Sequence, residues 1–417
     1  MVSGLPTGTR RGQVRRLPLW VVAVGPGLMV MLADTDAGSL ITAGQSGARW
    51  GYRLLLIELL LIPVLYLVME LTVRIGLTTG KGHAQLIREH FGCGWALLSV
   101  GALLVSVAGA LVTEFAGIAG VGRLYGVPAG LTVPAATVFL LAVVCTGGHR
   151  RVELIGIGLG LFELAFIAAA LFAHPSPHEL AHGLTASQPI GNSGYLALLA
   201  ANVGAVVMPW MIFYQQGSVV DKQLTVRHLR AARIDTALGA VLTQLVMIAV
   251  LVATAVAAGG HRASLQTVGQ LDAALTGALG TTAGRLILTL GLTGAALLAS
   301  IVVSLAAAWA VAEVAGSRRS LDEKPSQARF FYCLYAVTVV LGATLVLTAH
   351  SLVRLAIQVE IVNALLLPLV LGLLVVLAFR VLPQEHAPGR TRRVALSIAT
   401  GTLITIALLG VGLAFGL

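Results

Sequence analysis

Charged side chains are scarce in this 417-residue sequence. Asp, Glu, Lys and Arg together account for 11% of it, whereas soluble domains contain about 25% charged residues. Hydrophobic residues account for 57%, compared with about 45–50% in soluble domains. These values exclude an ordinary soluble protein and indicate side chains that face lipid, because lipid gives a side chain no reason to be polar. The first expected partner is therefore the lipid bilayer.

Cysteine is rare, and motifs for catalysis or nucleotide binding are missing. The three cysteines, Cys93, Cys145 and Cys333, share no ligand or disulfide spacing. The sequence contains no GxxxxGK[ST] phosphate-binding loop, no catalytic cluster and no soluble domain. We therefore expect no enzyme activity, no cofactor, no use of ATP and no obligate protein partner. These absences argue against the alternative of a membrane enzyme or sensor.

Lys and Arg are distributed unevenly about the apolar stretches. Of the 27, 21 fall on one side of the predicted spans. The six on the other side are Arg49, Arg53, Arg123, Arg262, Arg285 and Arg354. Such asymmetry follows the positive-inside rule, so the amino terminus is expected in the cytoplasm. The net charge of +10 is thereby explained without nucleic-acid binding, and a multi-pass protein of the bacterial plasma membrane is predicted.

Eleven apolar stretches are near or above the ~20 residues that a helix needs to cross a bilayer. They cover residues 19–47, 52–76, 95–121, 129–147, 152–173, 193–217, 234–258, 284–314, 331–349, 354–380 and 394–416. We predict an all-α integral membrane protein with a cytoplasmic tail at 1–18 and one transmembrane domain at 19–417. The odd number of spans places the carboxyl terminus outside. The loop at 174–192 is expected to form turns, and segment 221–233 a short interfacial helix.

Two of these stretches are interrupted. The first contains GPG at 25–27 and two acids shortly afterwards, and the sixth contains Met208-Pro209. Glycine and intramembrane acids disfavour a continuous helix, and proline cannot donate a backbone hydrogen bond. Broken helices one and six lie five spans apart. This spacing predicts a LeuT-type fold with inverted five-helix repeats at 19–173 and 193–380 and an extra helix at 394–416.

Asp34 and Asp36 are the most informative residues of the first break. A carboxylate inside the membrane costs about 2.5–3.5 kcal/mol on insertion scales, so it usually has a function. At an unwound segment it lies beside free backbone carbonyl groups, and such oxygen ligands suit hard divalent cations. The alternative is that one Asp merely caps the second half-helix, since Asp is a favourable N-cap residue.

The two breaks resemble those of the Nramp family of divalent metal transporters. That family has GPG and DPGN on helix one and GAxVMPH on helix six, which correspond to residues 25–27, 36–39 and 204–209 here. Weaker matches to its cytoplasmic connections lie at 79–81, 85–89 and 150–153. The similarity extends over roughly residues 20–380 and implies a secondary transporter whose substrate is a divalent metal ion.

On helix one, the resemblance implies three metal ligands. The family's DPGN aspartate falls on Asp36, and the carbonyl three residues earlier falls on Ala33. Ser39 replaces the family's asparagine. Its hydroxyl oxygen is a weaker metal ligand than the amide oxygen of asparagine. Asp34 is an additional acid and a further candidate ligand.

On helices six and ten, the resemblance implies three more. The helix-six methionine falls on Met208, and the carbonyl ligand three residues earlier falls on Ala205. The helix-ten glutamine falls on Glu360 when Leu367-Pro368 is aligned with that family's LP. Additional anionic oxygen favours hard, hydrated ions such as Mg²⁺, whereas the Met208 thioether favours softer Mn²⁺, Fe²⁺ or Cd²⁺. The alternative to a ligand role is that Met208 simply packs as an adaptable apolar side chain.

The family's proton route is altered in this sequence. The helix-six histidine is replaced by Trp210, and the helix-three pattern TDLAE keeps its first acid as Glu114 but has Gly117 in place of the second. The predicted ninth span has no arginine. These departures make the chain most similar to the Nramp-related magnesium transporters. We therefore expect import of Mg²⁺, and also Mn²⁺, by alternating access with weak or no proton coupling.

Two rival transport functions stay open at this point. One is a proton-coupled Mn²⁺/Fe²⁺ importer, and the other is a transporter of the same fold for an amino acid or another organic substrate. The second rival would need aromatic cover and a half-helix that binds a carboxylate, rather than acids at the break.

Several other polar residues have a functional and a simpler interpretation. Glu114, Gln215 and Gln216 are placed on a possible ion path, although the two glutamines also suit a helix end that faces water. The acids Glu58, Glu70, Glu163 and Glu313 either lie on such a path or pair with loop bases. His174, His178 and His182 recur every four residues outside the membrane and would suit a metal only if helical, which Pro175 and Pro177 disfavour.

Overall fold

The computed structural model describes residues 25–259, 265, 267–347 and 352–414, and these form only helices and their connections. The predicted tail at 1–18 and the start of the first span lie outside the described residues. The first half contains α2 (Pro26–Asp34), α3 (Ala37–Trp50), η1 (Gly51–Leu54), α4 (Leu55–Thr79), α5 (His83–Phe91), α6 (Cys93–Leu124), α7 (Ala129–Thr146), α8 (His149–Gly160), η2 (Leu161–Leu164) and α9 (Ala165–Phe172). The second half contains α10 (Pro177–Thr185), α11 (Ser193–Val206), α12 (Pro209–Asp221), η3 (Val226–His228), α13 (Leu229–Ala258), α14 (Val268–Leu279), α15 (Thr281–Ala315), α16 (Arg329–Val346), α17 (Leu352–Val381), η4 (Gln384–His386) and α18 (Arg390–Ala414).

The helices match the eleven predicted spans. Within the described residues, ten stretches are long and apolar enough to cross a membrane. The first of these, Ala37–Thr79, has 43 residues, about twice the length that one crossing needs. The short 3₁₀ turn η1 divides it into α3 and α4, which belong to the first and second predicted spans.

Two connections differ from their prediction. Residues 174–192 contain the helix α10, because Ser176 caps it by accepting a hydrogen bond from the Glu179 N–H and Pro177 suits the first helical position. Segment 221–233 is not a separate interfacial helix, since α12 continues to Asp221 and α13 begins at Leu229. The helices α5 and α14 were not predicted at all.

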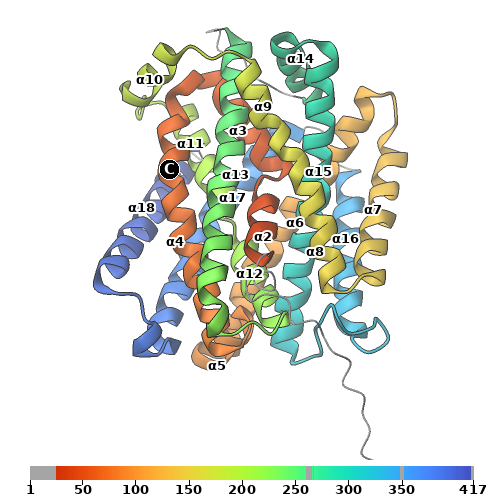
Figure 1. The fold of residues 1–417 in the computed structure, drawn as a ribbon, viewed down its shortest axis with the longest axis vertical. Coiled ribbons are helices and arrows are strands. Elements are labelled where there is room, and N and C mark those ends of the chain that lie inside the picture. The colour runs from red at the N-terminus through yellow and green to blue at the C-terminus, as the bar shows by residue number, and fades with distance from the viewer. Residues whose placement is uncertain (1–24, 260–264, 266, 348–351, 415–417) are drawn as a thin grey trace, which may run out of the picture.

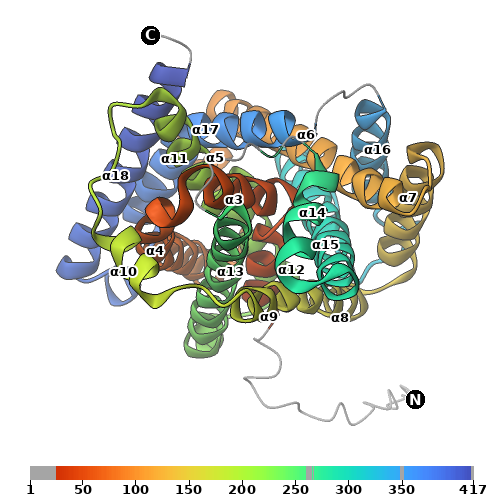
Figure 2. The same ribbon diagram turned by 90° about the horizontal axis from the view of Figure 1, so that it is seen from above.

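The broken helices lie at the centre of the bundle. Figures 1 and 2 show α2 and α12 inside the bundle, with α18 at the periphery on one side and α7 and α16 at the periphery on the other. Large apolar residues on these outer helices are exposed, for example Val138, Val337 and Ile398 at 67%, 55% and 64%. In a bilayer such side chains face lipid tails. Membrane embedding therefore explains both the exposed apolar surface and the polar centre.

The GPG segment anchors α2 at its first turn. The backbone N–H groups of Gly25 and Gly27 donate to Asp235 Oδ2 on α13, at 3.2 and 2.7 Å. Gly25 has φ of +128°, and a methyl group added there would collide with the Glu153 carboxylate. Glu153 in turn accepts from Lys222 Nζ at 2.8 Å. Asp235 from α13 thus satisfies donors at this helix end that would otherwise be unpaired.

Candidate functional site

The first break leaves a backbone carbonyl without its helical donor. Helix α2 ends at Asp34 and α3 begins at Ala37. In a continuous helix the Ala37 N–H would donate to the Ala33 carbonyl, but here it donates to Glu114 Oε2 at 3.1 Å. Asp36 caps α3 by accepting from the Ser39 N–H at 2.7 Å through Oδ1. The N-cap role proposed as the alternative for this acid is therefore real, although it occupies only one carboxylate oxygen.

The second break frees a carbonyl by a different route. Helix α11 ends at Val206 and α12 begins at Pro209. Pro209 has no N–H to donate to the Ala205 carbonyl four residues earlier. That carbonyl instead accepts a hydrogen bond from Ser39 Oγ at 3.2 Å. This single contact joins the two breaks and places Asp36, Ser39 and Ala205 together.

Glu360 reaches the same place from α17. A methyl group added at Gly38 would lie 2.5 Å from Glu360 Oε1, 3.3 Å from Asp36 Oδ1 and 3.5 Å from Thr113 Oγ1. Both carboxylates therefore approach the first turn of α3, and only glycine leaves them room. The geometry thus brings Glu360 to the breaks, and its role as a metal ligand stays a prediction.

Three of the candidate metal ligands each have a carboxylate oxygen without a hydrogen-bond partner. They are Asp34, Asp36 and Glu360, whose side chains are at most 1% exposed, and the buried acids Glu163 and Glu58 each have such an oxygen as well. A buried polar atom without a partner is costly, so each is best satisfied by a cation or a proton. No three His, Cys, Asp or Glu side chains in the described ranges form a ready-made metal cluster. An ion here would therefore need backbone carbonyls, the serine hydroxyl or water as well.

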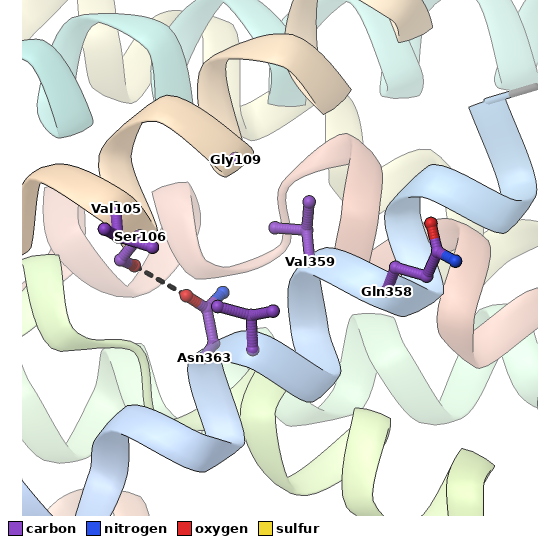
Figure 3. A pocket seen from close by; sticks show the side chains of 7 residues that line it. Val105, Ser106, Gly109, Gln358, Val359 and Asn363 are labelled. Carbon is purple, nitrogen blue, oxygen red and sulfur yellow. Dashed lines mark hydrogen bonds between the residues drawn. The ribbon is translucent and has the colours of Figure 1, made fainter. Parts of the chain in front are cut away.

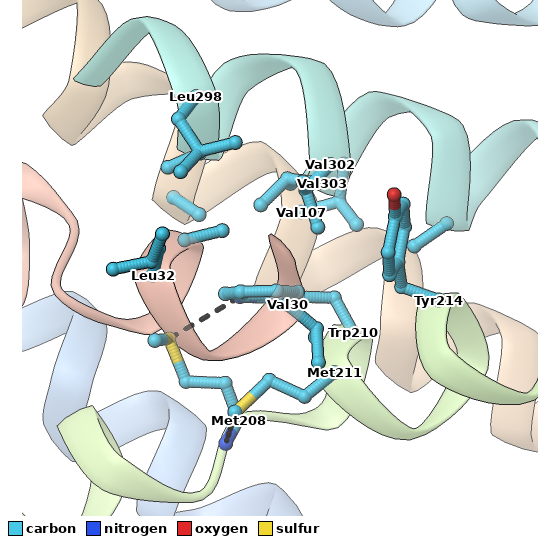
Figure 4. Packing of buried hydrophobic residues seen from close by; sticks show 14 of the residues in the cluster. Val30, Leu32, Val107, Met208, Trp210, Met211, Tyr214, Leu298, Val302 and Val303 are labelled. Carbon is cyan, nitrogen blue, oxygen red and sulfur yellow. Dashed lines mark hydrogen bonds between the residues drawn. The ribbon is translucent and has the colours of Figure 1, made fainter. Parts of the chain in front are cut away.

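Met208 lies in the second break, but its sulfur is engaged. Trp210 Nε1 donates to Met208 Sδ at 3.2 Å, and both side chains are fully buried (Figure 4). The residues around them, including Val30 and Leu32, are apolar. A thioether ligand would have to exchange this hydrogen bond for the metal ion. The packing interpretation of Met208 is thus visible in the structure, and its ligand role stays a prediction.

A buried polar chain leads from Glu360 to a pocket between α6 and α17. Asn363 Nδ2 donates to Glu360 Oε2 at 2.9 Å, and Ser106 Oγ donates to Asn363 Oδ1 at 2.6 Å. Figure 3 shows Ser106 and Asn363 at a pocket of about 200 Å³ between α6 and α17. Asn363 fixes the orientation of Glu360. Sequence reasoning missed it, because one amide in an apolar helix gives no signal of its partner.

The acids singled out as uncertain fall into two groups. Glu163 lies at the first break, where it accepts a hydrogen bond from the Thr35 hydroxyl. Glu114 contacts the same break through the Ala37 N–H. Glu70 instead pairs with arginines that lie on helices. Glu313 pairs with Arg319, which lies in a loop, and with the α5 backbone, so the interpretation of pairing with a loop base holds for Glu313. Glu58 is fully buried on α4.

Gln215 and Gln216 are fully buried, so the interpretation of a helix end that faces water is wrong for both. Gln215 donates to Thr236 Oγ1 at 3.0 Å. Gln216 Nε2 donates to the Lys81 carbonyl at 2.9 Å, and its Oε1 lies 3.0 Å from His83 Nδ1. The second glutamine thus holds α5 against α12, and a role on an ion path stays a prediction for both.

The burial of His83 makes stability depend on pH. Burial lowers the pKa of His83 to about 4, compared with about 6.5 in an unfolded chain. The unfolded state therefore binds more protons between these values. Stability is complete above pH 6.5 and is lost as the pH falls towards 4, by up to about 3 kcal/mol. We expect the thermal unfolding temperature in detergent to fall over this range, and His83→Gln to remove part of that fall.

His178→Gln is the matched control for this prediction, because His178 is exposed on α10. It should leave the pH profile unchanged. A profile of His83→Gln that coincides with the wild type would contradict the assigned role of the buried ring.

The histidines outside the membrane do not form a metal site. His178 and His182 lie on α10, whereas His174 precedes it with φ of +51°. None of the three belongs to a group of three metal-binding side chains among the described residues. The proline residues do not prevent a helix, but they leave His174 outside it.

Most of the chain, including both helix breaks, matches one known family. Residues 27–413 match the family model described as "Natural resistance-associated macrophage protein-like", Nramp. The chain belongs to the Nramp family. The predicted resemblance is therefore confirmed. The match continues beyond the roughly 20–380 over which the similarity was expected.

Curated Nramp relatives are similar over part of their length. The "Divalent metal cation transporter MntH" of Verminephrobacter eiseniae is 34% identical over 225 residues, which cover 52% of this chain and 49% of the relative. The protein of the same name from Staphylococcus aureus is 29% identical over 214 residues, covering 49% and 46%. This chain thus spans about half the length of the curated relatives it matches.

Solved structures confirm the LeuT-type fold expected for an Nramp protein. A structure of the Eremococcus coleocola manganese transporter covers 97% of this chain and 88% of its own, with TM-score 0.74 and 17% identity. A structure of MhsT in complex with L-phenylalanine covers 98% and 99%, with TM-score 0.60 and 17% identity. The overall fold is therefore shared with these proteins.

Proposed function

We propose that this chain is a secondary transporter that imports divalent metal ions. The supporting observation is the contact of Ser39 Oγ with the Ala205 carbonyl, which brings the two helix breaks together beside Asp36 and Glu360. Free carbonyl groups and buried carboxylates are the ligands that hard divalent cations take. The names of the curated relatives, divalent metal cation transporters, are in accord with this proposal.

Within this class we propose that Mg²⁺ is transported, and also Mn²⁺. Asp36, Asp34 and Glu360 each offer an unpartnered carboxylate oxygen, and anionic oxygen favours hard ions that keep part of their water. The Met208 sulfur, which would favour a softer ion, accepts a hydrogen bond from Trp210. The rival is a proton-coupled Mn²⁺/Fe²⁺ importer, and the manganese transporter among the structural neighbours keeps it open.

We further propose that proton coupling is weak or absent. Trp210 replaces the histidine implied by the family pattern, and Gly117 replaces its second helix-three acid. A methyl group added at Gly117 would lie 2.9 Å from Ala37 Cβ. A carboxylate side chain therefore has no room at this position. An organic substrate is disfavoured, because several acids lie at the breaks.

The proposed cycle alternates access between the two sides of the bacterial plasma membrane. Asp36, Ser39 and Glu360 are fully buried, which corresponds to an occluded state. Rocking of the helices around the breaks would open the site to one side at a time. The positive-inside rule places the amino terminus, and the end of the bundle with α5, in the cytoplasm.

Purified protein in liposomes tests this function with dyes for Mg²⁺, Mn²⁺ and pH. We expect both metals to enter without ATP, Mn²⁺ entry to be reduced by excess Mg²⁺, and the interior pH to change little. Mn²⁺ uptake that persists unchanged in excess Mg²⁺ and acidifies the interior would support the proton-coupled rival. Entry of neither metal would contradict the proposed function itself.

A further inference from the structure

A second polar cluster lies away from the metal site, where α4, α13 and α18 meet. Glu70 Oε1 accepts from Arg74 Nη2 and Arg233 Nε, both at 2.6 Å, and from Arg392 Nη1 at 3.5 Å. We define these three arginines as the arginine cluster. Three guanidinium groups share one carboxylate, so two positive charges are not compensated within the cluster.

The surplus charge lies on the accessible side. Glu70 and Arg74 are each 4% exposed, whereas the side chains of Arg233 and Arg392 are 31% and 46% exposed. The buried pair is thus neutral overall, and the two exposed guanidinium groups retain donors that face outwards. A ligand of the cluster would therefore be an anion.

The charged groups on neighbouring segments do not cancel this charge. Arg230 lies one turn before Arg233 on α13 and is exposed, as are Arg390 and Arg393 on α18. Asp235 faces the other way and caps α2. Glu385 in η4 is the exposed acid of these segments. The balance of the surface remains basic.

The helices of the arginine cluster also carry exposed apolar residues. Figures 1 and 2 show α4 between α13 and α18, and both of these helices pack against it. Ile234 and Leu238 on α13 are 52% and 64% exposed, and Leu60 on α4 is 54% exposed. An anionic head beside apolar tails is the chemistry of a phospholipid. A basic pocket between transmembrane helices on the cytoplasmic side binds such head groups.

We infer that the arginine cluster binds the phosphate of an anionic phospholipid of the cytoplasmic leaflet. The lipid phosphate interacts with Arg233 and Arg392, and its acyl chains lie along the apolar surface of α4 and α13. Glu70 holds the arginines in place but competes with the phosphate for their donors. The bound lipid ties α18 to α4 and α13.

Native mass spectrometry of the full chain, released from nanodiscs of phosphatidylglycerol or phosphatidylcholine, tests this site. We expect the wild type to retain phosphatidylglycerol preferentially. The double variant Arg233→Gln/Arg392→Gln should lose this preference by about fivefold for each arginine. Arg380→Gln is the matched control, because Arg380 is an exposed arginine at the end of α17 and should retain the wild-type preference.

Two further measurements distinguish a lipid site from a site for free phosphate and from a purely structural ion-pair cluster. Glu70→Gln removes the competing carboxylate, so it should retain phosphatidylglycerol at least as well as the wild type. We expect phosphatidylglycerol to raise the unfolding temperature of the wild-type protein. Millimolar inorganic phosphate, added to the protein in phosphatidylcholine, should not raise it.

The inference is overturned if the double variant retains as much phosphatidylglycerol as Arg380→Gln, or if free phosphate raises the unfolding temperature as much as phosphatidylglycerol. Arg392→Gln alone gives the same comparison should the double variant not fold, and none of these readouts depends on transport.

Discussion

Replacing Asp36 with alanine is expected to abolish metal uptake. The carboxylate is fully buried at the first break, and one of its oxygens has no partner. Removing one partner of a buried charge pair costs about 3–5 kcal/mol, and each 1.4 kcal/mol is tenfold in affinity. Uptake of Mg²⁺ or Mn²⁺ into liposomes should therefore fall by at least about a hundredfold at low metal concentration.

The capping role of Asp36 requires a second variant. Alanine also removes the hydrogen bond from the Ser39 N–H, and loss of an N-cap costs about 1 kcal/mol of stability. Asp36→Asn retains an oxygen for this cap but removes the charge. It should fold like the wild type and still fail to transport. Normal uptake by Asp36→Asn, at the level of the control Glu179→Gln on the exposed face of α10, would contradict a charge-based site.

The second large effect is expected at Gly204, where α11 and α17 touch. A methyl group added there would lie 1.9 Å from the Glu360 carbonyl oxygen and 2.9 Å from the Ala364 nitrogen. Both are backbone atoms, so the helices themselves would have to separate. Overpacking of this kind costs about 1–3 kcal/mol or more. Gly204→Ala should lower the unfolding temperature and, by displacing Glu360, reduce metal affinity.

Gly372→Ala is the matched control in α17, because an added methyl group meets no atom within 4 Å there. Alanine favours a helix over glycine by about 1 kcal/mol, so this variant should be as stable as the wild type or more stable. The close contact would be disproved if both alanine variants unfolded at the same temperature and transported metal equally.

The fold and the two breaks were predictable because their causes are local. Pro209 removes a donor wherever it stands in a helix, so the freed Ala205 carbonyl follows from the sequence alone. Asp34 and Asp36 interrupt an apolar stretch. Placing a carboxylate inside the membrane costs free energy, so such a residue indicates a function. Transmembrane length and the distribution of Lys and Arg follow from the same local physics.

The remaining parts of the site depend on contacts between distant segments. The Ala37 N–H donates to Glu114, 77 positions away, in place of the Ala33 carbonyl, and α2 is capped by Asp235, more than 200 positions away. Gly38 and Gly204 are two of 48 glycines, and only the structure shows that their missing side chains make room for Glu360. No periodicity marks such pairs, so the sequence did not reveal them.

A crystal structure determined with Mn²⁺ and its anomalous scattering tests the proposed metal site most directly. We expect one strong anomalous peak between the two helix breaks, within ligand distance of the Asp36 carboxylate and the Ala205 carbonyl and near Glu360. The same peak should be absent from Asp36→Asn at equal Mn²⁺ concentration. A peak elsewhere in the bundle, or an unchanged peak in Asp36→Asn, would contradict a site built on the buried Asp36 carboxylate.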